Sequence, residues 1–186
     1  MCKIIHVLTD SYIHAEIENF DEFTAFGRNV ALTLPIDSSF PEMKIQAYAV
    51  PDDIFKTGVW TLISENILRV LYSLGAKSYI QIFRADVKLK SGCSAGNYYV
   101  LHVLKQVDCF DEINSKFEKK NELYCNVKKL EIIHNNVCDE DCIFRISNFP
   151  NSPFILNSRA AKEFKNSDLK GIEYFSIEEW NQSELI

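Results

Sequence analysis

The sequence is poor in the residues and segments that mark several classes of protein. It has only 6 glycines and 5 prolines, against 47% hydrophobic residues, which excludes collagen-like, low-complexity and disordered chains. No apolar run approaches the roughly 18 residues of a membrane-spanning helix, so we expect no membrane segment. Positive charge is in deficit, because 20 Lys and Arg against 26 Asp and Glu give a net charge of −6. Such a surface repels phosphate backbones, and we expect no nucleic-acid partner.

A secretion signal is also missing from the start of the sequence. The first ten residues, MCKIIHVLTD, hold one lysine and an apolar run interrupted by His6, which is too short for a signal peptide. A chain of this length buries an ample core without cross-links. We therefore expect a cytoplasmic protein whose six cysteines are free thiols: Cys2, Cys93, Cys109, Cys125, Cys138 and Cys142.

Patterns typical of β-strands dominate what is present. Residues 79–89 alternate apolar and polar side chains, and a loop at 91–97 leads to a second strand at 98–107, which together predict a hairpin. The polar segment 108–121 reads as a connection with one helical turn. Further strands are predicted at 3–9, 43–50, 123–133, 143–147 and 172–177.

Helix signals are few and short. Ser64 is a predicted N-cap, Ile67 and Leu71 follow at helical spacing, and Gly75 ends the element. A similar strand–helix–strand unit recurs near the end of the chain, with its helix at 159–164. These elements predict an α+β fold: a single domain with a mostly antiparallel sheet and a few short helices.

The chain divides into a poorly patterned segment, residues 1–57, and a clearer region, residues 58–186. In the first segment, Phe20, Phe23 and Phe26 recur every three residues and predict a short helix closed by Gly27 as a left-handed C-cap. We expect both parts to belong to one fold.

The most metal-like cluster is His134, Cys138 and Cys142, with acidic residues between the two cysteines. Zinc generally takes four ligands, and the chain has no Cys-x2-Cys pair to complete the set. Asp108, Asp111 and Glu112 do not match a calcium loop either. We therefore expect no metal ion, and the absence of a phosphate-binding glycine loop leads us to expect no cofactor.

Cys109 is the best candidate nucleophile, because it follows a predicted strand in the run Asp108-Cys109-Phe110-Asp111. Such a thiol needs a base, which His102 or His134 would have to supply. No catalytic-cysteine signature surrounds Cys109, so we expect no catalytic residues.

Arg145 is the one charged residue in the predicted strand at 143–146. It is either a surface residue or partly buried, and a partly buried arginine is almost always paired. The second option predicts an ion pair with Asp108 or Asp111. Our candidates for structural roles are Asp108, Cys109, Asp111, Arg145 and Gly171. Gly171 precedes the last predicted strand.

Six short runs, in this order, carry a family resemblance. They are SENI at 64–67, YIQIF at 79–83, YYVLHVL at 98–104, VDCFD at 107–111, IFRI at 143–146 and LKGIEYF at 169–175. In them the sequence resembles the bacterial immunity protein family eleven of polymorphic toxin systems, formerly a domain of unknown function. The resemblance covers about the last two-thirds of the chain.

The resemblance implies an immunity protein that binds and neutralises a cognate toxin encoded beside it, with no catalytic residues to carry over. The acidic chain suits a basic toxin, although neither the toxin-binding residues nor the oligomeric state follow from the sequence. Two alternatives stay open at this point: a small cysteine-dependent enzyme using Cys109 and a histidine, and a binding module for a small ligand.

Overall fold

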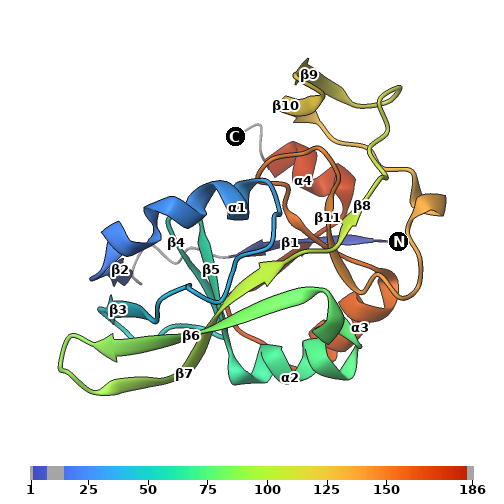
Figure 1. Ribbon diagram of the computed structural model, residues 1–186. Helices are drawn as coiled ribbons and strands as arrows, with labels where there is room; N and C mark the ends of the chain where they lie inside the picture. The colour runs from blue at the N-terminus through green and yellow to red at the C-terminus, as the bar shows by residue number, and fades with distance from the viewer. Residues whose placement is uncertain (1, 8–14, 184–186) are drawn as a thin grey trace.

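The computed structural model describes residues 2–7 and 15–183, and their strands form two sheets and a separate hairpin (Figure 1). The five-stranded sheet has the order β13 (Ile172–Phe175), β1 (Lys3–Val7), β12 (Phe154–Leu156), β11 (Ile143–Ile146) and β8 (Gln106–Val107). The six-stranded sheet has the order β2 (Ala15–Ile17), β3 (Met43–Ala47), β6 (Ile80–Leu89), β7 (Ser94–Val103), β5 (Trp60–Ser64) and β4 (Ile54–Thr57). The hairpin pairs β9 (Lys116–Lys120) with β10 (Leu123–Lys129).

The helices are short. The α-helices are α1 (Gly27–Ala31), α2 (Glu65–Ser73), α3 (Ser158–Asn166) and α4 (Ile177–Ser183), and the 3-10 helices are η1 (Phe20–Phe26), η2 (Ala76–Ser78) and η3 (His134–Asn136). No helix of the described residues is both long and apolar enough to cross a membrane. The predicted α+β class with mostly antiparallel pairing is confirmed, and parallel pairing occurs between β3 and β6 and between β11 and β8.

Two strand–helix–strand units share one topology. In the first, α2 connects β5 to β6, and β7 lies between these strands, antiparallel to both. In the second, α3 connects β12 to β13, and β1 takes the same place between them. The similarity of the two units in sequence is therefore matched by a similarity in strand order.

Local contacts account for where the two predicted helices begin. The Ser64 side chain accepts a hydrogen bond from the Asn66 backbone N–H, and Gly75 follows α2 with φ +89°. Asn157 caps α3 by accepting from the Ala160 N–H. Both helices turn apolar side chains inward, which anchors them between the sheets.

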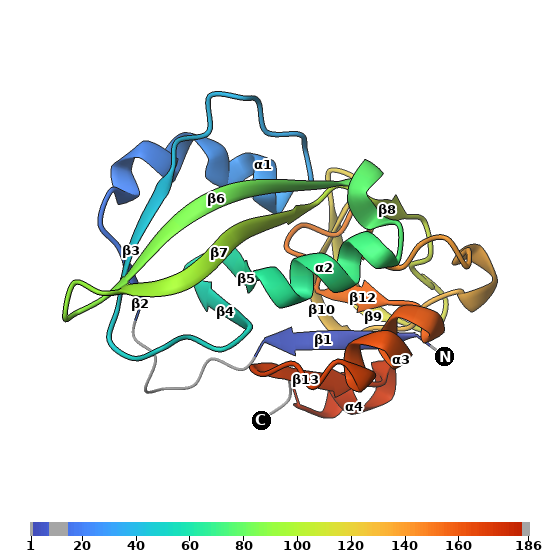
Figure 2. The ribbon, with the colours of Figure 1, turned by 90° about the horizontal axis from the view of Figure 1, so that it is seen from below.

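Three hydrophobic cores separate the layers. The central core lies between the two sheets and includes residues from α2 and α3: Ile5, Ile63, Ile67, Leu71, Leu101, Ile143, Leu156, Ala160 and Phe164. The α4 core covers the other face of the five-stranded sheet and includes Ile4, Cys109, Phe110, Tyr124, Phe144, Ile155 and Trp180. The α1 core covers the other face of the six-stranded sheet and includes Phe23, Val30, Met43, Trp60, Leu62, Ala85 and Val100. In Figure 2, α1 and α4 lie on opposite outer sides, with α2 between them.

Strands covered on both faces read as continuous apolar runs rather than alternating ones. In β11, all four residues are buried: Ile143 belongs to the central core and Phe144 to the α4 core. The same alternation holds for Ile4 and Ile5 in β1 and for Leu62 and Ile63 in β5.

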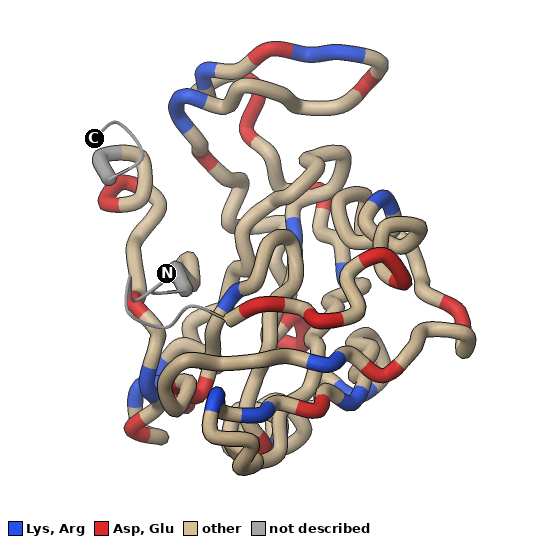
Figure 3. The backbone as a smooth tube through the Cα atoms, turned by 90° about the vertical axis from the view of Figure 1, so that its left-hand side faces the viewer, with Lys and Arg blue, Asp and Glu red and all other residues tan. Residues whose placement is uncertain are grey.

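The β9–β10 hairpin projects from the body, as Figures 1 and 3 show. The sequence predicted only a connection with one helical turn in this region, and that prediction is wrong, because β9 begins at Lys116. The base of the hairpin is attached through the Tyr124 ring, which stacks on Phe110 at a centroid distance of 3.9 Å.

Two other local predictions need correction, and one helix was missed. Gly27 does not close a helix as a left-handed cap: its φ is −55°, and η1 runs directly into α1 through it. The loop of the β6–β7 hairpin is shorter than predicted, since β7 begins at Ser94. Helix α4, after the last strand, was not predicted. Residues 8 and 9 of the predicted first strand lie outside the described residues.

Candidate functional site

Cys109 lies in the α4 core and is fully buried. Burial, with smaller effects of Cys2, Asp108 and Asp141, raises the pKa of its thiol to about 12. A nucleophilic cysteine needs the opposite shift, toward the thiolate. The environment of Cys109 therefore favours an inert packing role.

The predicted bases are elsewhere. His102, in β7, is buried and has its Nε2 2.8 Å from the Leu34 carbonyl oxygen. His134 is exposed in η3. Among the described residues, no hydrogen bond joins either imidazole to the Cys109 thiol. The structure does not assemble the cysteine–histidine pair that the enzyme alternative requires.

Asp111 organises a surface turn. Its carboxylate accepts hydrogen bonds from the backbone N–H groups of Ile113 and Asn114 and from the Asn114 side chain. The side-chain bond from Asn114, followed by the backbone bonds, lowers the pKa of Asp111. Asp108, in contrast, lies exposed between β8 and Cys109.

The residues of the metal-like cluster have different environments and do not form one site. Cys142 is buried, with its Sγ 2.9 Å from the Tyr79 hydroxyl, whereas Cys138 is exposed. Across residues 2–7 and 15–183, no group of three or more His, Cys, Asp or Glu side chains is placed to hold a metal ion. The six cysteines are free thiols.

Arg145 does not form the ion pair that the sequence predicted. It is only 7% exposed, and none of the ion pairs among the described residues joins it to Asp108 or Asp111. Its Nη1 donates instead to the Val30 carbonyl oxygen in α1 at 2.8 Å, and its guanidinium lies over the Phe154 ring at 4.9 Å. The Nε atom is buried and has no hydrogen-bond partner among the residues that the structure describes.

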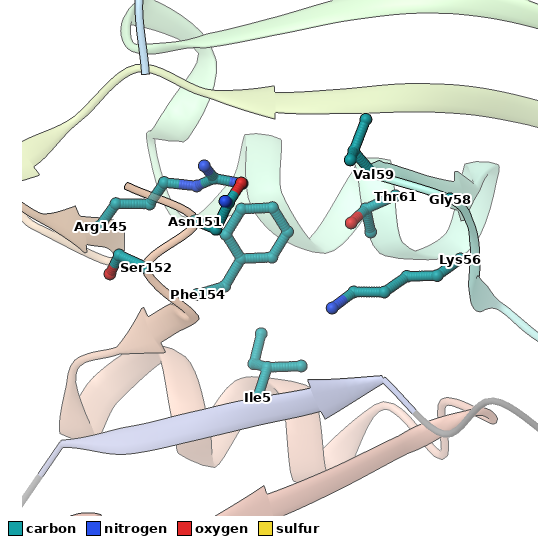
Figure 4. A pocket seen from close by; sticks show the side chains of 9 residues that line it. All are labelled: Ile5, Lys56, Gly58, Val59, Thr61, Arg145, Asn151, Ser152 and Phe154. Carbon is teal, nitrogen blue, oxygen red and sulfur yellow. The ribbon is translucent and has the colours of Figure 1, made fainter. Parts of the chain in front are cut away.

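A pocket of about 230 Å³ adjoins this arginine, between the two sheets. We call it the Arg145 pocket. Figure 4 shows Arg145 extending above the Phe154 ring with Asn151 beside it, while Lys56 and Thr61 enter from the opposite wall. Its lining residues are Ile5, Lys56, Gly58, Val59, Thr61, Arg145, Asn151, Ser152 and Phe154.

The loop before β12 forms one wall of the Arg145 pocket. The Asn151 N–H donates to the Ala31 carbonyl oxygen, which ties the loop to α1. The Ser152 hydroxyl accepts from the Ile146 N–H and donates to the Pro153 carbonyl oxygen. These bonds fix the wall that faces the guanidinium.

The Arg145 pocket has two basic residues in its lining. It is lined by Arg145 and Lys56 and by no acidic residue of the described chain. Burial lowers the pKa of Arg145 to about 10, which leaves the guanidinium charged at neutral pH. The pocket therefore combines a desolvated cation with polar groups on both walls.

Gly171 lies at a close approach of two segments. Its φ is +80°, and a Cβ at this position would lie 2.7 Å from the Asp52 Cβ and closer still to the Ile54 carbonyl oxygen. The turn before β13 thus packs directly on the start of β4. A side chain has no room there.

Sequence reasoning named Arg145 but missed the rest of the pocket. Lys56 and Thr61 come from a segment far from Arg145 in the sequence, and no local motif connects them with Arg145 and Asn151. The one available signal was the arginine inside an apolar run, which marks a buried cation that requires compensation.

These features define an α+β protein in which two sheets enclose a helical layer, with a buried cation beside a pocket. The sequence model of the Immunity protein family (Imm11) matches residues 11–179. The chain belongs to this family, and membership indicates an immunity function. The match begins well inside the segment that we could not recognise from the sequence. No curated protein matches the chain.

Proposed function

We propose that this protein neutralises a cognate toxin of a bacterial polymorphic toxin system by direct protein–protein binding in the cytoplasm. The observation that carries the proposal is the family match, which extends over residues 11–179 of the 186-residue chain. An immunity protein of this kind needs a stable scaffold with a complementary surface. The three cores supply the scaffold.

The proposed action is non-enzymatic. The high thiol pKa of Cys109 and the separate environments of His102 and His134 support binding rather than covalent chemistry. Toxin neutralisation should therefore not depend on the Cys109 sulfur atom.

The distribution of charge supports a basic toxin. The hairpin segment, residues 116–129, carries five lysines and two glutamates, so the remainder holds 15 cationic and 24 acidic residues. The body is thus more acidic than the net charge of −6 suggests. We propose that the acidic body, and not the hairpin, steers a basic toxin toward the complex.

Co-expression with the toxin encoded by the neighbouring gene tests this proposal. We expect the protein to rescue the host from that toxin and from no unrelated toxin, and the two purified proteins to form a complex. The variant Cys109→Ala should rescue equally, which separates binding from cysteine chemistry. Loss of rescue by a folded Cys109→Ala protein would favour the enzyme, and failure to bind any neighbouring gene product would refute the proposed function.

The salt dependence of the association rate tests the proposed electrostatic steering. Salt at physiological strength shortens the Debye length to about 8 Å, so the association rate with a basic toxin should fall several-fold as salt is raised. The dissociation rate should change much less. A salt-independent association rate would remove the charge argument and leave the binding itself intact.

A further inference from the structure

The Arg145 guanidinium is buried with its charge uncompensated by any carboxylate of the described residues. Arginine is almost never fully buried unless it is paired, and leaving a charge in a poorly solvated site is costly. The neighbouring carbonyl oxygen of Val30 accepts one hydrogen bond, but a carbonyl group carries no net charge. Among the described residues, therefore, no group supplies a negative charge at this site.

The arginine is also held in one orientation. The Nη1 bond to α1 fixes one corner of the guanidinium, and the Phe154 ring supports its plane. The Nε–H is buried and has no partner among the described residues. Because Nε is itself buried, only the terminal nitrogens of the guanidinium can face the adjoining space, and no carboxylate of the described residues is paired with them.

The adjoining space suits a small charged ligand. Its volume of about 230 Å³ corresponds to several water molecules at roughly 30 Å³ each. Figure 4 shows the Thr61 hydroxyl and the Lys56 chain directed inward from the wall opposite Arg145, and the Asn151 amide next to the guanidinium. The Thr61 hydroxyl and the Asn151 amide can donate hydrogen bonds to an anion.

We propose that the Arg145 pocket is a binding site for a small oxyanion, a carboxylate or phosphate group of a low-molecular-weight ligand. The guanidinium supplies the charge, while Thr61 and Asn151 supply neutral donors. Water would fill the same space without cancelling the charge. This inference does not depend on the toxin, because the pocket is defined by contacts within this chain.

Binding of such a ligand should stabilise the folded protein, because the pocket is formed only when the two sheets are packed together. Thermal unfolding of the full chain is measured in sodium phosphate, sodium acetate and sodium chloride at equal ionic strength and pH, with acetamide as the uncharged analogue of acetate. We expect a saturable rise in Tm with phosphate or acetate over chloride, none with acetamide, and a stoichiometry of one by calorimetry.

The two anions distinguish the kind of oxyanion. A response to acetate alone identifies a carboxylate site, a response to phosphate alone identifies a phosphate site, and a response to both shows that the pocket accepts either group. Absence of a saturable response to both anions overturns the proposal.

Arg145→Lys retains the charge but replaces the guanidinium, which Val30 and Phe154 hold in one orientation, with a flexible ammonium group, and should weaken binding about tenfold or more. Arg69→Gln is the matched control, because Arg69 is exposed and paired with Glu65 at 2.6 Å on the outside of α2. It should bind as the unsubstituted protein does. Equal weakening in both variants, or unchanged binding in Arg145→Lys, overturns the assignment.

A second variant keeps the test valid if substitution of Arg145 impairs folding. Asn151 has φ +57°, a conformation that glycine adopts readily, so Asn151→Gly removes the amide while its backbone bond to Ala31 remains. We expect several-fold weaker anion binding with the fold retained. In the unsubstituted protein, the NMR signal of the Arg145 Nε–H should shift on titration with the anion, and an unshifted signal contradicts binding beside the guanidinium.

Discussion

Single residues at close backbone contacts have effects that exposure alone does not predict. Gly171 must combine a left-handed φ with contact against Asp52 and Ile54, whereas Gly75, with φ +89°, has open space where a Cβ would lie. Both substitutions with alanine add backbone strain of about 1–2 kcal/mol. Gly171→Ala also forces β4 away from the turn, so we expect it to cost about 1–3 kcal/mol more than Gly75→Ala.

Urea unfolding of the two glycine variants measures that difference directly. Gly75→Ala is the control for strain, since it changes the same residue type in the same backbone region. Equal losses of unfolding free energy would show that the segment containing Asp52 moves aside, and that Gly171 is needed only for the left-handed backbone conformation of its turn.

Arg145 illustrates a residue whose burial works against stability. Without a carboxylate partner among the described residues, its desolvation is offset only by the Val30 bond and the Phe154 contact. The Val30 oxygen also accepts from the Thr33 N–H at 3.3 Å, so it does not depend on the arginine. We expect Arg145→Met to unfold within about 1 kcal/mol of the unsubstituted protein, or to be more stable.

Thermal and urea unfolding in chloride buffer test this expectation. Had the predicted ion pair been present, removal of one partner would have cost a few kcal/mol. A loss of that size in Arg145→Met would show that the contacts of the guanidinium with α1 and Phe154 outweigh its desolvation.

At the scale of elements, Asp53 joins three segments. Its carboxylate accepts from the Ser64 hydroxyl at 2.5 Å, from the Asn66 side chain at 3.1 Å and from the Lys170 N–H at 3.0 Å. It thereby connects the start of β4, the N-terminus of α2 and the turn before β13. Partial burial raises the pKa of Asp53, but these hydrogen bonds outweigh burial and hold it below the ordinary value of 3.8.

The direction of this shift determines how stability depends on pH. Because the pKa is lower in the folded state, the unfolded chain takes up the proton first as the pH falls. The stabilisation is therefore present above the unfolded pKa and is lost as the pH falls through the folded pKa. We expect Asp53→Asn to lower Tm at pH 7 and to differ much less from the unsubstituted protein near pH 3.

Glu163→Gln, which neutralises an exposed carboxylate of α3, is the control for the loss of one negative charge. Tm is followed from pH 7 to pH 3 for all three proteins. A constant difference between Asp53→Asn and the unsubstituted protein over this range would contradict the pH argument.

Local signals explain which elements could be predicted. The Ser64 cap, the apolar spacing of α2 and the alternation along β6 depend on neighbours in the sequence. Strand β9 was missed because its residues are mostly exposed, so no burial pattern marks it. Helix α4 carried a usable signal: Ser176 and Glu179 form a reciprocal capping box, each side chain accepting from the other residue's N–H.

The site was harder to predict than the fold. A strand pattern places Arg145 in a buried run, but its surroundings depend on α1 and on β4 and β5, which are remote in sequence. The position of Gly171 against β4 is equally non-local. The position of Asp108 and Asp111 just after a predicted strand suggested a partner for Arg145 that the three-dimensional arrangement does not provide.

At the scale of the whole molecule, the five-stranded sheet connects two cores. Consecutive residues of β1, β11 and β12 alternate between the central core and the α4 core, so neither core can come apart without disturbing these strands. This sharing predicts one cooperative unfolding transition for the two cores. The buried cysteines provide a reporter in each, with Cys142 in the central core and Cys109 in the α4 core.

Thiol labelling under increasing urea measures the opening of both cores in the unsubstituted protein. Cys93 and Cys138 are exposed and should react without denaturant, which provides an internal control for the reagent. Cys109 and Cys142 should become reactive only on global opening. Peptide mass spectrometry should give the same opening free energy and the same urea dependence for both, because the strands that bury them are shared. Labelling of Cys109 at urea concentrations that leave Cys142 protected would mean that the α4 core unfolds separately, and that the five-stranded sheet can persist with one face uncovered.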